Sequence, residues 1–111
     1  MQQMTSHLTG NASFDVAPAR LTIDLGAVVD NWRTFSSLSG RASASAVVKA
    51  DGYGLGGTAV GRALYSAGCR DFFVATAEEG VALRAALADA RIFVLMGLWA
   101  GIEEQILAAN L

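Results

Sequence analysis

Four short apolar segments, each followed by apolar residues at helical spacing, most constrain how this chain can fold. The strand-like segments cover residues 21–25, 44–49, 72–75 and 92–96. Helical spacing follows over about residues 28–35, 58–67, 76–87 and 102–107. Apolar strands that alternate with helices form parallel sheets covered by helices. The order βαβαβαβα therefore predicts an α/β fold built from parallel (βα) units.

The repeat leaves two architectures open. Four parallel strands have two unpaired edges unless they join more sheet, and a complete (βα)8 barrel takes about 250 residues. The 111-residue chain is therefore expected to be either a small four-stranded domain or the first half of a barrel.

Composition excludes several classes of protein. With 53% apolar and 16% charged residues, the chain is too apolar to be disordered. Its net charge of −2 disfavours an electrostatic grip on nucleic acid, and no apolar run approaches the roughly 20 residues of a membrane span. The single cysteine, Cys69, favours a reducing compartment, which predicts a cytoplasmic protein.

Residues 1–18 are predicted to form a flexible polar tail that ends at the only proline, Pro18, and lacks the features of a secretory signal. The only histidine, His7, lies in this tail without other ligands nearby, so no metal site is predicted.

Polar residues mark the predicted helix starts. Thr58 is expected to cap the helix over 58–67, and Gly68 is expected to end it in a left-handed conformation. The segment Thr76-Ala-Glu-Glu79 has the pattern of a capping box, in which the Thr76 hydroxyl and the Glu79 carboxylate each accept a backbone amide.

Lys49 is the only lysine of the chain and is predicted to be the last residue of the second strand. Strand alternation puts Val47 on the same face as Lys49, and parallel α/β sheets bind ligands at the carboxyl ends of their strands. A partly desolvated amine at that position suits covalent chemistry with a carbonyl group, and the Tyr53 hydroxyl follows one turn later. The pattern leaves equally open that Lys49 is a solvated surface amine.

A second interpretation uses the glycines that follow Lys49. Gly52, Gly54 and Gly57 fit the spacing G-x-G-x-x-G, which would make this loop a dinucleotide cradle with Asp71 or Glu78 as its acidic partner. Three residues separate the strand from the first glycine, and the strand is the second of the chain instead of the first, so this alternative is the weaker one.

The segment around Lys49 resembles the pyridoxal-phosphate attachment segment of alanine racemases. The likeness is strongest over Ala46-Val-Val-Lys-Ala-Asp-Gly-Tyr-Gly-Leu-Gly56. It continues through Leu21-Thr-Ile-Asp-Leu-Gly-Ala27, Phe73-Val-Ala-Thr-Ala-Glu-Glu-Gly80 and Ile92-Phe-Val-Leu-Met-Gly97.

The resemblance implies that residues 19–111 form the amino-terminal half of a (βα)8 barrel, from a homodimeric enzyme that interconverts L- and D-alanine for peptidoglycan. Lys49 would hold pyridoxal phosphate as a Schiff base and act as one of two proton-transfer bases. Tyr53 would contact the cofactor phosphate, and Val47 and Leu95 would line the cofactor pocket. A broad-specificity racemase or a non-catalytic pyridoxal-phosphate carrier would share the same lysine.

Two residues depart from the family pattern. The family commonly has alanine at the position of Gly52 and histidine at the position of Leu55. The family's second base, its arginine at the pyridine nitrogen and its main phosphate loop would follow Leu111. The chain is therefore expected to be a fragment that is inactive in isolation and prone to associate through its open sheet.

Overall fold

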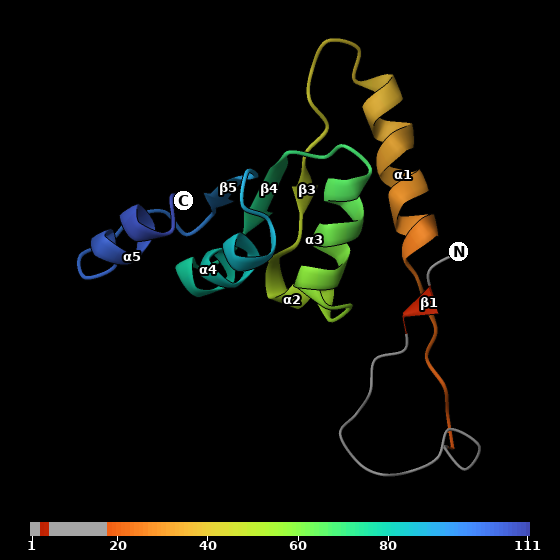
Figure 1. Cartoon of the computed structure of the whole chain (residues 1–111), viewed down its shortest axis with the longest axis horizontal. Helices are drawn as coiled ribbons and strands as arrows, with labels where there is room; N and C mark the ends of the chain where they lie inside the picture. Colours follow the sequence, from red (N-terminus) through yellow and green to blue (C-terminus); the bar gives the residue numbers. More distant parts are fainter. Residues whose placement is uncertain (1–2, 5–17) are drawn as a thin grey trace.

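A parallel three-stranded sheet lies at the centre of the computed structural model, which describes residues 3–4 and 18–111 (Figure 1). Its strands run in the order β3, β4, β5, with bounds Ala46–Val47, Asp71–Val74 and Arg91–Val94. Both neighbouring pairs are parallel, so the predicted (βα) organisation is confirmed for these three strands.

Five helices accompany the strands in the described residues. They are α1 (Leu25–Leu38), α2 (Lys49–Tyr53), α3 (Gly57–Ser66), α4 (Ala77–Ala86) and α5 (Glu103–Ala108). Gly68 has φ +115° just after α3, as predicted for a glycine that ends a helix, and α5 begins with Glu103 and Glu104, whose charges suit the first turn of a helix. None of the helices in the described ranges is long and apolar enough to cross a bilayer.

The two faces of the parallel sheet have different environments. Ala46, Phe72 and Ile92 are aligned across the three strands and are buried. They belong to the same core as Val60 and Leu64 of α3 and Leu83 of α4. Helices therefore cover this face of the sheet.

The opposite face of the sheet carries the residues between these, because successive side chains of a strand point to opposite faces. Val47, Phe73 and Phe93 are aligned on it, and the rings of Phe73 and Phe93 stack with their centroids 4.8 Å apart. Val47 and Phe93 are 46% and 44% exposed, so this face is apolar but open.

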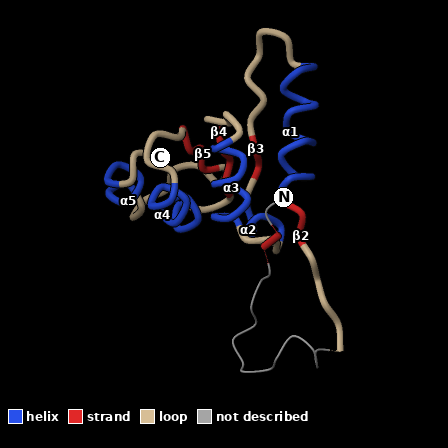
Figure 2. Tube along the Cα trace, turned by 45° about the vertical axis from the view of Figure 1, so that its right-hand side comes forward, coloured by secondary structure: helices blue, strands red, loops and turns tan. Residues whose placement is uncertain are grey.

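The first predicted strand differs from expectation. Only Ile23–Asp24 form a strand, β2, and it pairs antiparallel with β1 (Gln3–Met4) instead of joining the parallel sheet. Figures 1 and 2 show this pair apart from β3 to β5. The strand is short because the Asp24 side chain accepts the Ala27 amide at 3.1 Å and starts α1 at Leu25.

The tail prediction for residues 1–18 stays a prediction, because residues 1–2 and 5–17, and with them His7, lie outside the described residues. The pairing of Gln3–Met4 with β2 was not anticipated from the polar sequence around them.

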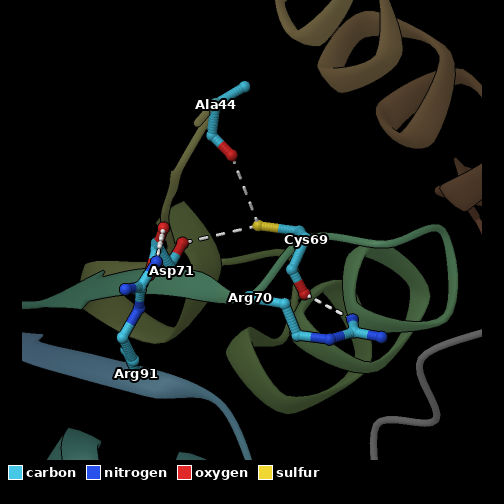
Figure 3. A network of polar contacts seen from close by, with 5 residues as sticks. All are labelled: Ala44, Cys69, Arg70, Asp71 and Arg91. Carbon is cyan, nitrogen blue, oxygen red and sulfur yellow. Dashed lines mark hydrogen bonds and ion pairs between the residues drawn. The ribbon is translucent and has the colours of Figure 1, made fainter. Parts of the chain in front are cut away.

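Cys69, Asp71 and Arg91 lie together at the amino ends of β4 and β5 (Figure 3). The Arg91 guanidinium donates to both oxygens of Asp71, with Nη2 2.8 Å from Oδ2. The Cys69 thiol is buried and contacts the carbonyl oxygens of Asp71 and Ala44 at 3.4 and 3.8 Å. Burial raises the pKa of the Cys69 thiol above its usual value.

Candidate functional site

Lys49 lies at the carboxyl edge of the parallel sheet, as predicted, but it is not the last residue of the strand. The Val48 amide still donates to the Phe73 carbonyl at 2.9 Å. The backbone then turns at Val48 (φ −122°, ψ 22°), and Lys49 is the first residue of α2. Within the described part of the chain no group forms a hydrogen bond or ion pair with its half-exposed side chain.

The residues that follow Lys49 form a left-handed turn. Ala50 (φ 52°, ψ 47°), Asp51 (53°, 46°) and Gly52 (64°, 37°) are all left-handed, and Tyr53 has φ 56°. The Gly52 amide donates to the Val48 carbonyl, and the Gly54 amide to that of Ala50, at 2.9 and 3.0 Å. Each non-glycine residue in this conformation costs roughly 1–2 kcal/mol, so contacts from outside the turn must stabilise it.

Asp51 supplies one such contact. Its Oδ1 accepts the Gly57 amide at 2.8 Å and so connects the turn to the first residue of α3. The two segments approach closely where they meet, because a Cβ on Gly52 would lie 3.1 Å from the backbone of Gly57 and would require one of them to shift slightly. The prediction that Thr58 caps this helix was wrong: α3 starts one residue earlier, after Gly56, and has no side-chain cap.

Glu79 supplies the second contact. Its Oε1 accepts the Ala50 amide at 2.7 Å, and its Oε2 accepts the Ala75 amide at 2.8 Å. The Thr76 hydroxyl accepts the Glu79 amide at 3.3 Å, so half of the predicted capping box is confirmed. The Glu79 carboxylate also accepts backbone amides, as predicted, but their donors are Ala75 and the distant Ala50 instead of Thr76 itself.

The neighbouring acid, Glu78, has no comparable contact with the turn. Its side chain is exposed in the first turn of α4, and hydrogen bonds from its own amide and the Thr76 hydroxyl lower the pKa of its carboxyl group. Two adjacent glutamates therefore differ in what they bind, and the sequence alone did not distinguish them.

Two of the four predicted site residues lie at the same groove. Val47 and Tyr53 line an open cavity of about 500 Å³ between α1 and the segments of β3, α2 and α3, together with Leu55. Tyr53 is 62% exposed.

Lys49 and Leu95 are not among the residues that line this groove. The Leu95 amide donates to the Val74 carbonyl at 2.9 Å, so Leu95 continues β5 by one residue and is 54% exposed. It lies two strands from β3, which corresponds to about 10 Å across the sheet.

The geometry disfavours the dinucleotide interpretation. Asp71 is at the amino end of β4, the opposite end of the sheet from the glycines, and it is paired with Arg91. The Gly57 amide at the start of α3 is already bound by the Asp51 carboxylate, where a pyrophosphate would need free amides. The described residues contain no group of three or more metal-ligating side chains.

Comparisons with known proteins identify the family of this chain. Residues 23–111 match the family model described as alanine racemase, N-terminal domain. The biosynthetic alanine racemase of Agrobacterium fabrum is 58% identical over 94 residues, which cover 85% of this chain and 24% of that protein. An alanine racemase of Rhizobium meliloti is 56% identical over 88 residues, which cover 79% of this chain and 23% of that protein.

A solved structure is similar as well. The crystal structure of alanine racemase from Bartonella henselae with covalently bound pyridoxal phosphate superposes with a TM-score of 0.76 and 42% identity. The match covers 80% of this chain and 25% of that one, so the chain spans about a quarter of the length of the relatives it matches. Its parallel (βα) units correspond to the amino-terminal part of the barrel, and the chain belongs to the alanine racemase N-terminal domain family.

Proposed function

We propose that this chain supplies the cofactor-bearing lysine of a pyridoxal-phosphate-dependent alanine racemase. The observation that carries the proposal is the position of Lys49. It is the only side-chain amine, it lies at the carboxyl edge of a parallel sheet, and no described residue binds its ammonium group. A related alanine racemase holds pyridoxal phosphate covalently.

The residues around Lys49 fit this cofactor. Val47 and Leu95 offer exposed apolar side chains on the open side of the sheet, against which an aromatic ring can pack. The exposed Tyr53 hydroxyl can donate a hydrogen bond to a phosphate oxygen. These three residues and Lys49 are the cofactor-binding set that we propose.

The proposed reaction interconverts L- and D-alanine, because the relatives are named alanine racemases. The bound cofactor would disperse the negative charge that develops at the substrate Cα. The Lys49 amine would bind the cofactor covalently and, once displaced by substrate, would move the Cα proton on one face. The base on the other face would come from a part of the enzyme that follows Leu111.

The cellular setting forms part of the same proposal. The buried free thiol of Cys69 supports a reducing compartment such as the cytoplasm, where D-alanine would be made for peptidoglycan. The open apolar face of the sheet supports a parent enzyme in which further barrel units cover it, and we propose in addition that this enzyme is a homodimer.

Titration of the chain with pyridoxal phosphate tests the proposal. We expect an absorbance band of the lysine adduct that saturates at one cofactor per chain and is absent in Lys49→Arg, which keeps the positive charge but loses the nucleophile. The α-amino group can also react with pyridoxal phosphate, but it is present in both proteins, so the absorbance of Lys49→Arg gives the background to be subtracted. Equal bands in the two proteins would contradict the proposal.

A second measurement concerns the reaction. In deuterated water, the parent enzyme with pyridoxal phosphate should exchange the Cα proton of L-alanine faster than free pyridoxal phosphate does. Lys49→Arg should reduce the rate to that of the free cofactor, because the base on one face is lost.

A further inference from the structure

We propose that Glu79 is a positioning residue for Lys49, an inference that rests on the proposed function. Its carboxylate connects the peptide group directly after Lys49 to the end of β4. One oxygen accepts the Ala50 amide and the other accepts the Ala75 amide, at 2.7 and 2.8 Å. The two amides are on segments that are distant in sequence and meet at the carboxyl edge of the sheet.

The left-handed turn explains why such a connection is needed. Ala50 is a non-glycine residue at φ 52°, a conformation that an isolated chain rarely adopts. The Ala50 amide belongs to the planar peptide group that joins Lys49 to Ala50, so a hydrogen bond to it fixes the orientation of that plane and of the backbone from which the Lys49 side chain leaves. The hydrogen bond from Ala50 to Glu79 therefore restrains the backbone at Lys49, at the point where the left-handed turn begins.

Glu79 is itself held in place. The Thr76 hydroxyl accepts its amide, and its side chain lines a cavity of about 120 Å³ with Val48, Asp51 and Val74. A carboxylate held by its own helix can fix a neighbouring loop more firmly than a freely rotating one. Two carboxylates therefore hold the turn from opposite sides, with Asp51 connecting it to α3 and Glu79 connecting it to α4.

A glutamine at position 79 would serve only one of the two amides. A carboxylate has two acceptor oxygens, whereas a carboxamide has one oxygen and one NH₂ group that faces the second N–H donor. Glu79→Gln should therefore have an intermediate effect and Glu79→Ala the full effect. Glu78→Gln is the matched control, since it removes the same charge at the adjacent exposed position.

The test combines amide hydrogen exchange by NMR with the rate at which pyridoxal phosphate forms its absorbing adduct with the chain. In Glu79→Ala, exchange at Ala50 and Ala75 should accelerate about tenfold or more, as expected for a lost hydrogen bond to a charged group. Exchange at Arg91 in β5, whose amide donates to the Arg70 carbonyl at 2.8 Å, should stay unchanged, which shows that the sheet remains folded. Adduct formation at Lys49 should slow by roughly tenfold, with partial recovery in Glu79→Gln and no change in Glu78→Gln.

Three results would overturn the inference. If the Ala50 amide exchanges equally in Glu79→Ala and the unmodified chain, the hydrogen bond does not hold the turn. If exchange accelerates but adduct formation keeps its rate, Glu79 holds the turn without positioning Lys49. If the unmodified chain forms no adduct while Glu79 protects the Ala50 amide, the proposed function fails and the positioning role fails with it.

Discussion

The substitution Ala50→Gly should stabilise the fold, although alanine to glycine is normally destabilising. Ala50 has φ 52° and an exposed side chain, so its methyl group contributes little packing. Its backbone amide would still donate to Glu79 after the substitution. The change therefore alters the backbone preference of one residue and leaves its known contacts in place.

Two effects of opposite sign determine how much Ala50→Gly changes the free energy of unfolding. An L-residue in the left-handed region costs roughly 1–2 kcal/mol, which glycine does not incur. Glycine also makes the unfolded chain more flexible, which costs about 0.4–1 kcal/mol. The free energy of unfolding should therefore increase by about 0.8 kcal/mol, the difference between the midpoints of the two ranges.

Urea unfolding followed by circular dichroism measures this difference. Ala82→Gly provides a control of opposite sign, because Ala82 is also exposed but lies inside the right-handed helix α4. That substitution should lower the free energy of unfolding by about 0.5–1 kcal/mol. If Ala50→Gly destabilised the chain as much as Ala82→Gly does, the left-handed turn after Lys49 would be refuted.

Two further predictions concern the core. Phe72 is fully buried in the central strand, so Phe72→Ala should cost about 3–5 kcal/mol in urea unfolding, whereas Phe35→Ala, at a position 67% exposed, should cost less than about 1 kcal/mol. Burial raises the pKa of the Cys69 thiol in the folded chain above its usual 9.0. Below that value the thiol is neutral in both states, whereas at higher pH it ionises first in the unfolded chain, so the free energy of unfolding decreases. Between about pH 8 and about pH 10, the unmodified chain should lose more stability than Cys69→Ala, and equal losses would contradict this effect.

The periodicity of the sequence predicted much of the fold because the core follows it closely. Ile92 is buried between the exposed Arg91 and Phe93, and Phe72 and Val74 are buried on either side of the less buried Phe73, as the alternation of a strand requires. The first strand was shortened because Asp24 caps a helix, so a side chain in the strand pattern ended the strand early. Hydrophobic periodicity cannot show that the same residues could continue a strand or start a helix.

The site was predictable in its residue types and only partly in its geometry. The single lysine beside a glycine-rich segment predicted the location of the candidate site, and the structure places Lys49 at the carboxyl edge of the sheet. The left-handed conformation of Ala50 and Tyr53 was missed, because neither residue type favours it. Glu79 was interpreted as a local cap since its partner Ala50 is 29 residues away, a distance that no local pattern encodes.

The covalent bond at Lys49 is the central claim, and borohydride reduction in the presence of pyridoxal phosphate tests it most directly. Reduction fixes the adduct, and peptide mass mapping then locates it. We predict that the peptide containing Lys49 carries the added cofactor and that prior modification of the amino terminus does not diminish it. Labelling confined to the α-amino group, with Lys49 unmodified, would contradict the account.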